Sequence, residues 1–299
     1  MFNTPNSIQA TSLTLQGGTA TFNTPLTAGS LSLSGGGLTG TGNVTVPGLT
    51  TWTGGQIAGS GTLLAAGGLE LTSSGFKDLR GRTLTSPATA HFGGTGFLAL
   101  AQGAVFSNTG VFEALSDADV ANFFGGSATF LNAGTLIKTG AGTTTAFSGV
   151  TFNNTGTVDV QSGALSLAAG GTSSGAFTIG GAATLEFAGG VSTLTTASSV
   201  AGTGTLRFAS GTTNLLGTYL ATGPLVFTGG SASFDTLNDI QAASLILQAG
   251  TGTFNRALTT GSASISGGTL SGTGDVTVSG PTTWTGGQVA GSGALLGAP

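Results

Sequence analysis

A stretch of sequence near the start of the chain recurs near its end, and this repeat limits the possible folds more than any other feature. Residues 2–66 return at 234–298 without a gap, so that Trp52 is matched by Trp284, and the difference between these two numbers, 232, is the length of the repeating unit. In the longer frame, residues 1–67 correspond to 233–299. The substitutions are mild, as in Ile57 to Val289. Such self-similarity is typical of stacked repeat proteins, in which each coil buries its apolar face on its neighbours.

A shorter period runs inside the long repeat, and its length of about 20 residues is typical of solenoids. The segment Leu225-Val226-Phe227 is matched by Leu245-Ile246-Leu247 at this period. Apolar residues also alternate with polar ones, as in Val44-Thr45-Val46 and Ser30-Leu31-Ser32-Leu33, which indicates strands with one buried face. Gly-Gly and Thr-Gly pairs separate these strands, and glycine supplies the backbone freedom that tight turns need. No segment has the 3.6-residue period of a helix.

The predicted fold class is therefore all-β: an elongated parallel β-solenoid, or β-helix, with coils of about 20 residues, continuous over 1–299. Composition agrees, with 57 glycines and only 5% charged residues, against roughly 25% charged in ordinary globular domains. The mean hydropathy of +0.36 argues against a disordered low-complexity chain. One stretch, about 70–120, departs from the regular glycine and threonine pattern and holds many of the charged residues.

A trio of similar short sequence motifs predicts a ladder of stacked side chains. Phe106, Phe130 and Phe152 are each followed two positions later by an asparagine, namely Asn108, Asn132 and Asn154. The intervals between successive members of the trio are close to the length of one coil. We expect the rings to stack inside the coil and the amides to bond along the axis at a shared turn.

Phrases such as Thr151-Phe152-Asn153-Asn154-Thr155-Gly156 and Trp52-Thr53-Gly54-Gly55 resemble the tandem β-strand repeats of large secreted bacterial surface proteins. These proteins are the adhesins of the autotransporter-passenger and filamentous-haemagglutinin kind. The resemblance covers nearly the whole chain, and it implies an extracellular or cell-surface location in a bacterium. The first residues, Met1 and Phe2 onward, have neither a basic nor an apolar leader region, so we expect the sequence to begin inside a longer protein.

The charge of the chain bears on its partners. Six Lys and Arg residues and a net charge of −4 give little basis for neutralising phosphates, so nucleic acid is not an expected partner. Glycine, serine or threonine interrupts every apolar run, so no membrane insertion is expected. With no cysteine there is no disulfide framework. We expect no cofactor.

The irregular stretch 70–120 is the candidate place for a site. A surface-binding patch there would use Lys77, Arg80, Arg82, Glu113, Asp117 and Asp119. The alternative, which we favour, is a loop with solvated ion pairs of about 0–1 kcal/mol each. Asp117 and Asp119 lack the spacing of a calcium loop. His91 is the only histidine, and we expect it to be a half-buried structural aromatic near the position that Trp52 takes in its own coil.

The sequence favours a structural role. The leading hypothesis is the body of an extracellular fibre, filament or surface-protein stalk, whose partners are copies of itself or further covalent repeats. The alternative is an adhesin module that binds a glycan or a cell surface through 70–120. A polysaccharide-degrading β-helix enzyme is the remote alternative, because such enzymes need clustered carboxylates that this chain scarcely offers. We therefore expect no catalytic or metal-binding residues.

Overall fold

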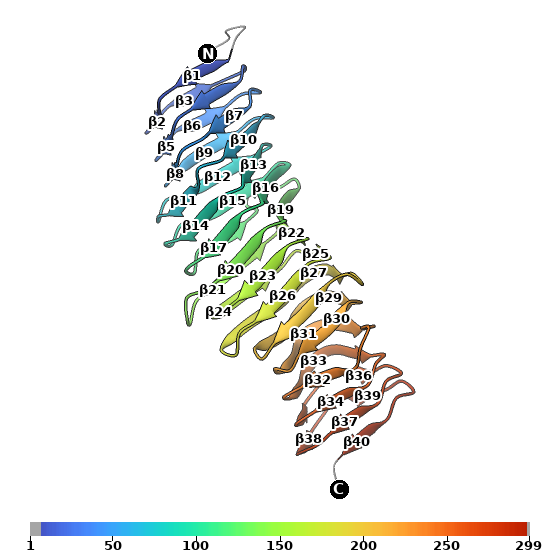
Figure 1. Ribbon diagram of the computed structural model, residues 1–299. Coiled ribbons are helices and arrows are strands. Elements are labelled where there is room, and N and C mark those ends of the chain that lie inside the picture. Colours follow the sequence, from blue (N-terminus) through green and yellow to red (C-terminus); the bar gives the residue numbers. More distant parts are fainter. Residues whose placement is uncertain (1–6, 298–299) are drawn as a thin grey trace. The chain divides into compact units, whose positions relative to one another are not determined.

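The computed structural model describes residues 7–297, and these form parallel strands stacked in coils, a β-solenoid without any helix in the described range (Figure 1). The chain divides into two compact units, Met1–Asn153 and Asn154–Pro299. The prediction of a parallel β-solenoid is confirmed, and so is the coil length of about 20 residues that is typical of this architecture. None of the described residues belongs to a helix long and apolar enough to cross a membrane.

In the first unit, each coil contributes one strand to each of three ranks, and strands of one rank pair in parallel. The first rank is β1 (Ile8–Ala10), β4 (Leu26–Ala28), β7 (Val44–Val46), β10 (Thr62–Ala65), β13 (Thr83–Ser86), β16 (Ala104–Asn108) and β19 (Ala128–Asn132). The second is β2 (Leu13–Leu15), β5 (Leu31–Leu33), β8 (Thr50–Trp52), β11 (Leu69–Thr72), β14 (Thr89–Gly93), β17 (Val111–Ala114) and β20 (Thr135–Lys138). The third is β3 (Thr19–Thr21), β6 (Gly37–Thr39), β9 (Gly55–Ala58), β12 (Lys77–Arg80), β15 (Leu98–Ala101), β18 (Val120–Ala121) and β21 (Thr144–Ser148). Strand β22 (Thr151–Asn154) lies at the boundary of the units.

The second unit has the same parallel pairing, and four of its strands are 10–12 residues long. One rank is β23 (Thr157–Val160), β26 (Ala176–Ile179), β28 (Ser199–Gly202) and β30 (Thr218–Ala221). A second set is β24 (Gly163–Leu167), β25 (Gly171–Ser173), β27 (Ala183–Leu194), β29 (Thr205–Leu215), β31 (Leu225–Phe234), β33 (Leu245–Phe254), β35 (Ala263–Ile265), β36 (Thr269–Ser271), β38 (Thr282–Trp284) and β39 (Gln288–Val289). The last set is β32 (Ile240–Ala242), β34 (Leu258–Thr260), β37 (Val276–Val278) and β40 (Leu295–Gly297).

The two copies of the long repeat are not folded identically. Residues Leu13–Leu15 and Thr19–Thr21 are two separate strands, β2 and β3. Their equivalents in the second unit lie in one continuous strand, β33. The register of β33 with β31 shifts near Thr228, which marks the bend that the separate strands replace with a turn.

The core lies inside the coils and is built by alternation along each strand. In the second rank of the first unit, Trp52, Leu71, Phe92 and Ala114 are all fully buried, and the register places Phe92 beside both Leu71 and Ala114. The neighbouring outward positions carry Thr51, Glu70 and His91. Period-two patterning therefore decides which side chains reach the surface.

Tight turns fix the corners where the coils stack. Gly40 and Gly59 have φ values of 111° and 103°, and a Cβ at either would overlap a backbone carbonyl oxygen of the preceding coil. Only glycine fits such a corner, since it has no side chain and adopts positive φ freely. Coil length varies because the turns differ: Ile8 pairs with Leu26, whereas Val120 pairs with Phe147, which lies much further along the chain.

Candidate functional site

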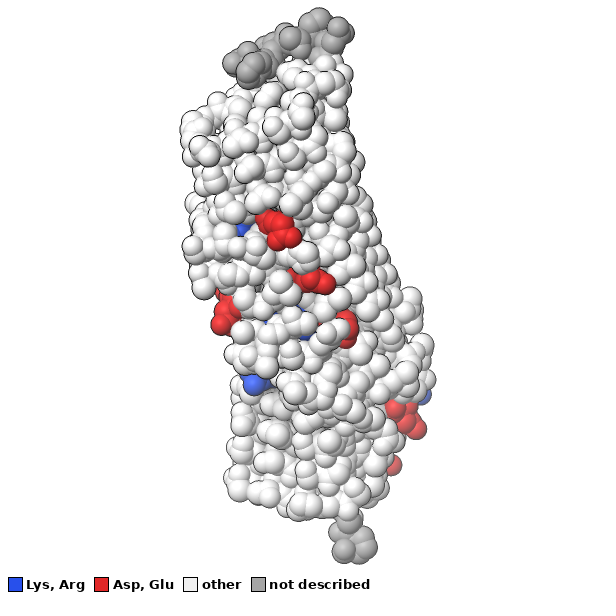
Figure 2. Space-filling view, turned by 60° about the vertical axis from the view of Figure 1, so that its left-hand side comes forward, with Lys and Arg blue, Asp and Glu red and all other residues white. Residues whose placement is uncertain are grey.

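Two members of the candidate surface patch in 70–120 do not reach the surface, and they are not part of a solvated loop either. Lys77 and Arg82 are fully buried, so neither can contact a partner, and the prediction that they belong to a surface patch is wrong. Figure 2 shows a surface on which charged side chains are few and separated. The sequence could not show that both cations point inward, because their partners are backbone carbonyls at turns.

Lys77 occupies an inward position in β12, in register with Leu98 of β15. Its Nζ donates to the carbonyl oxygen of Gly75 at 2.8 Å and to Oγ of Ser73 at 3.0 Å. Burial lowers the pKa of Lys77 to about 8, because the charged form loses its water. The ammonium therefore closes the preceding turn from inside.

Arg82 donates four hydrogen bonds to main-chain carbonyls of two earlier coils. Nη2 donates to Gly40 at 2.7 Å and Nη1 to Gly42 at 3.3 Å. Nε donates to Ala58 at 3.1 Å, and Nη1 also donates to Thr62 at 3.2 Å. Burial lowers the pKa of Arg82. The guanidinium thus satisfies carbonyls at the glycine corner, which would otherwise be desolvated without partners.

The two aspartates of the predicted patch, Asp117 and Asp119, accept hydrogen bonds from the backbone. Oδ1 of Asp117 accepts from the backbone N–H of Thr144 at 2.7 Å, and Oδ1 of Asp119 accepts from that of Ala146 at 2.7 Å. Burial raises the pKa of Asp119, and the bond from Ala146 offsets part of that rise. Lys138 lies fully buried nearby and donates to the carbonyl oxygen of Ser116 at 2.8 Å.

His91 lies between two carboxylates on the outer face of the second rank. The register aligns Glu70, His91 and Glu113 on β11, β14 and β17. Nδ1 of His91 is 2.5 Å from Oε1 of Glu70, and Nε2 is 3.2 Å from Oε2 of Glu113. The bond to Glu70 raises the pKa of His91, burial lowers it, and the two carboxylate charges raise it further.

The expected placement of His91 was wrong by one residue. It is Leu71 and Phe92, not His91, that share the inward column of Trp52. His91 is nevertheless half-buried as expected, since its side chain is 40% exposed. A shift of one position turns a strand residue to the opposite face. Within residues 7–297, no group of three or more His, Cys, Asp or Glu side chains is arranged to hold a metal ion.

The motifs that contain the ladder phenylalanines and asparagines lie in register within the first unit. Phe106 pairs with Phe130 and Asn108 with Asn132 on β16 and β19. The rings of Phe106 and Phe130 are stacked 5.0 Å apart, and those of Phe130 and Phe152 are 5.7 Å apart. Nδ2 of Asn108 donates to Oδ1 of Asn132 at 2.7 Å. In the second unit, Nδ2 of Asn154 donates to the carbonyl oxygen of Ala176 at 3.3 Å.

Four partly exposed phenylalanines form a cluster that the sequence reasoning missed. The aromatic cluster consists of Phe76, Phe97, Phe123 and Phe124, which are 41%, 38%, 52% and 41% exposed. Ring centroids are 5.7 Å apart for Phe76 and Phe123, 6.0 Å for Phe76 and Phe124, and 5.1 Å for Phe97 and Phe123. The Phe123-Phe124 pair was an available signal, because adjacent apolar residues break the alternation and cannot both point inward.

The backbone positions the cluster on the outer face of the third rank. Phe76 and Phe97 directly precede β12 and β15, whose first residues are paired, while Phe123 and Phe124 belong to the turn after β18. That turn is held by Asn122, whose Oδ1 accepts from the N–H of Phe124 at 3.3 Å and whose Nδ2 donates to Gly126 at 2.8 Å.

Polar side chains lie beside the aromatic cluster. The Arg80 guanidinium lies 3.7 Å above the Phe124 ring and pairs with Asp78 at 2.8 Å. Nε2 of Gln56 donates to Asp78 at 2.9 Å. Ala99 and Ala101 are in register with Asp78 and Arg80 and so face outward, yet both are fully buried. Ala99 is also in register with Ala121 of the following coil, so it lies between two coils.

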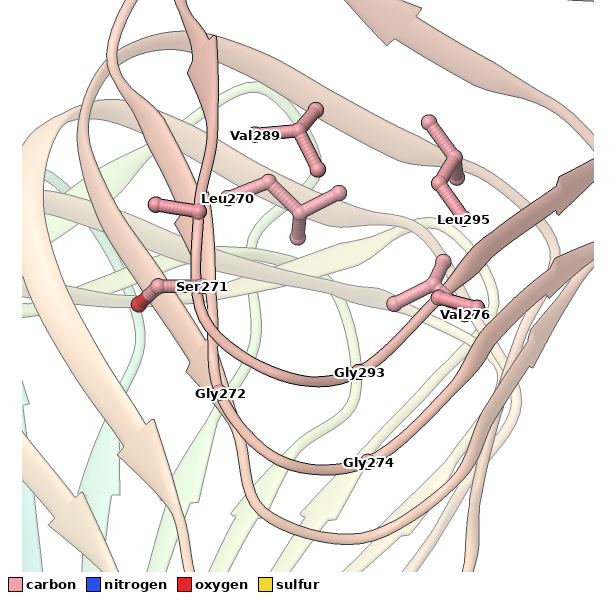
Figure 3. A pocket seen from close by; sticks show the side chains of 10 residues that line it. Leu270, Ser271, Gly272, Gly274, Val276, Val289, Gly293 and Leu295 are labelled. Atoms are coloured by element: carbon pink, nitrogen blue, oxygen red, sulfur yellow. The ribbon is translucent and has the colours of Figure 1, made fainter.

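A hollow near the end of the second unit is too small for a free ligand molecule. It is lined mainly by Leu270, Val276, Val289 and Leu295 together with small residues of the neighbouring turns (Figure 3). Its volume of about 10 Å³ corresponds to about one water molecule. No titratable side chain lines it.

Comparison with known proteins gives no relative. No protein-family model matches the chain, and neither a curated protein nor a solved structure matches it. The fold and the geometry of its residues are therefore the only basis for a functional proposal.

Proposed function

We propose that this chain is the structural body of an extracellular fibre, filament or surface-protein stalk built from tandem repeats. The observation that carries the proposal is that the buried cations form hydrogen bonds with the turns of the chain itself. Lys77, Arg82 and Lys138 are bonded to carbonyl or hydroxyl oxygens of turns. Arg82 and Lys138 join successive coils, Lys77 closes the turn before its own strand, and cations held in this way are not free to act on a substrate.

The packing of the coils supports the same proposal. Parallel strands pair along each unit, and stacked rings such as Phe106 and Phe130 fill the interior. Each coil therefore buries its apolar face on its neighbours, and such arrays extend by adding repeats. The partners of a body of this kind are further repeats, covalent or in other copies of the chain.

Immunogold electron microscopy on the organism that carries the gene tests the proposal. Antibodies raised against the purified chain should label filaments or stalks on intact, unpermeabilised cells. An antibody to a cytoplasmic protein serves as the control for cell integrity. Label that requires permeabilisation would show that the chain is not part of a surface structure.

Surface recognition by an adhesin module is the second candidate. The aromatic cluster is the observation that favours it, since exposed apolar patches mark interaction sites. This role is compatible with a structural body, because a stalk can carry a binding surface on its side.

A further inference from the structure

The hollow near the end of the second unit lies at the position where Arg82 is bound in the first unit. The residues whose carbonyl oxygens accept from Arg82 are Gly40, Gly42, Ala58 and Thr62. Adding the repeat length of 232 to each number gives Gly272, Gly274, Ala290 and Ala294, and all four line the hollow (Figure 3). The same corner therefore occurs twice in the chain, and in the first unit it holds a guanidinium.

The backbone of the two corners has the same conformation. The φ angle is 111° at Gly40 and 125° at Gly272, and a Cβ at either would overlap a carbonyl oxygen of the preceding coil. The N–H groups of Gly42 and Gly274 each donate at 2.9 Å to the carbonyl oxygen of a phenylalanine one coil earlier. Because the peptide unit is planar, the backbone sets the direction of each carbonyl group. The second corner therefore presents its oxygens as the first one does.

The hydrogen bonds within the second corner leave it able to accept a cation. The carbonyl oxygen of Gly272 accepts from the N–H groups of Ser292 and Gly293 at 3.1 and 3.2 Å. These neutral bonds are longer than the 2.7 Å bond from Arg82 to Gly40, and a charged donor forms the stronger hydrogen bond. The residues that line the hollow carry no charge, so none of them repels a guanidinium.

The first unit also shows which element supplies the guanidinium. Arg82 directly precedes β13, and β11, β12 and β13 form the coil that pairs with β8, β9 and β10. The equivalents of these last three strands in the second unit are β38, β39 and β40. The coil with Arg82 also places Leu71 over Trp52, which is fully buried, whereas Trp284 is 54% exposed. A coil of this sequence would therefore cover both the corner and Trp284.

A second copy of the chain stacked head to tail fits the corner less well. Its first-rank strand, β1, would take the place of β13, and the residue that directly precedes β1 is Ser7. Serine carries no charge and is too short to reach four carbonyl oxygens, whereas arginine has five N–H donors in a planar fork. The first coil of another copy would therefore leave the corner unfilled.

We propose that the carbonyl oxygens of Gly272, Gly274, Ala290 and Ala294 form a guanidinium-binding site for the arginine of a further repeat coil, with the sequence of residues 68–86, that stacks on β38, β39 and β40. This inference rests on the proposed function, in which the partners of the chain are further repeats. The arginine donates to the four carbonyls as Arg82 does in the first unit. It also fixes the register of the added coil, because a slip by one residue turns each side chain to the opposite face.

The test compares the chain with an extended chain in which residues 68–108 of the same sequence follow Pro299. This addition supplies the coil that contains the arginine and one more coil to cover it. The readout is the quenching of tryptophan emission by acrylamide, since Trp284 is 54% exposed and Trp52 is fully buried. In the extended chain, most of the quenching should be lost because the added coil covers Trp284.

Two substitutions in the added coil isolate the guanidinium. Arg82→Lys keeps the charge but loses the planar fork, so the hydrogen-exchange protection of β38, β39 and β40 should fall at least about tenfold relative to the unsubstituted extended chain. Arg80→Lys in the same coil is the matched control, because Arg80 pairs with Asp78 of its own strand at 2.8 Å. This control should leave the protection unchanged.

Three results would overturn the proposal. Acrylamide could quench Trp284 equally in both chains, or the Arg82→Lys and Arg80→Lys versions of the added coil could be equally protected. Sedimentation could also show that the unextended chain assembles head to tail with loss of Trp284 quenching, in which case a second copy is the occupant. Immunogold labelling of intact cells tests the structural body separately, and none of these results would change its outcome.

Discussion

Replacing Arg82 tests whether a buried cation holds the glycine corner together. The Arg82→Ala variant removes four hydrogen bonds to carbonyls, at distances of 2.7–3.3 Å. Bonds to a charged donor contribute about 1.5–3 kcal/mol each, but the cation also loses its cost of burial when it is removed. The net expectation is a destabilisation of about 3–5 kcal/mol, because each carbonyl oxygen left without a donor costs about 1–3 kcal/mol and the relief from burying the cation offsets part of that sum.

Two further variants separate the hydrogen bonds from the packing. Arg82→Met keeps the aliphatic stem and should cost about 1 kcal/mol less than Arg82→Ala, because it leaves a smaller cavity. Arg256 is the matched control, since its Nε donates to the carbonyl oxygen of Thr236 at 2.9 Å from an exposed position. Arg256→Ala should cost less than about 1 kcal/mol.

The assay combines urea unfolding, followed by circular dichroism, with hydrogen exchange resolved along the chain. Repeat proteins unfold in parts, so the loss of protection should concentrate in the coils around Gly40, Gly42, Ala58 and Thr62. If Arg82→Ala were no more destabilising than Arg256→Ala, or if protection were lost elsewhere, the reasoning would be refuted.

Three other predictions concern single side chains. The pKa of His91 is raised, so its bonds to Glu70 and Glu113 stabilise the fold at about pH 5 and lose that effect as pH rises through the folded-state pKa. The variant His91→Gln should therefore flatten the pH dependence of the melting temperature in that range. An unchanged pH profile would contradict this. Burial lowers the pKa of Lys77 to about 8 from 10.5, so the unfolded chain binds more protons between these values and stability should rise with pH across them. Urea unfolding should show that Lys77→Met removes this rise, and an identical rise in the variant would disprove the assignment. Phe130→Ala should cost about 3–5 kcal/mol in urea unfolding, whereas Leu131→Ala, on the outward face of the same strand and 36% exposed, should cost less than about 1 kcal/mol; equal losses would contradict the alternation.

The parts of the fold that repeat could be predicted, because repetition reports which residues occupy equivalent positions. Phe106 and Phe130 begin similar phrases about one coil apart in the sequence, and they pair at the register position that this spacing implies. Alternation likewise predicted the short strands, such as Val44–Val46. Backbone pairing between coils makes these local signals consistent with the global arrangement.

The positions of the charged residues could not be predicted in the same way. Arg82 reaches the carbonyls of Gly42 and Gly40, two coils earlier in the chain, and no local pattern encodes that contact. A substitution of Lys77, Arg80 and Arg82 by alanine, designed to test a surface patch, would remove two buried cations. It would report on folding and not on recognition. The aromatic cluster escaped notice because its rings come from two strand starts and one turn.

The turn after β18 carries two rings of the aromatic cluster, Phe123 and Phe124, and it directly follows the irregular stretch. Long turns cost a solenoid little, because the entropy of closing a loop grows slowly with its length. The long coil from Val120 to Phe147 therefore does not by itself indicate a function. Its side chains are unusual for a turn, since a solvated turn is stable with polar residues and this one carries Phe123 and Phe124. The Phe123 ring packs against those of Phe76 and Phe97, which directly precede two neighbouring strands.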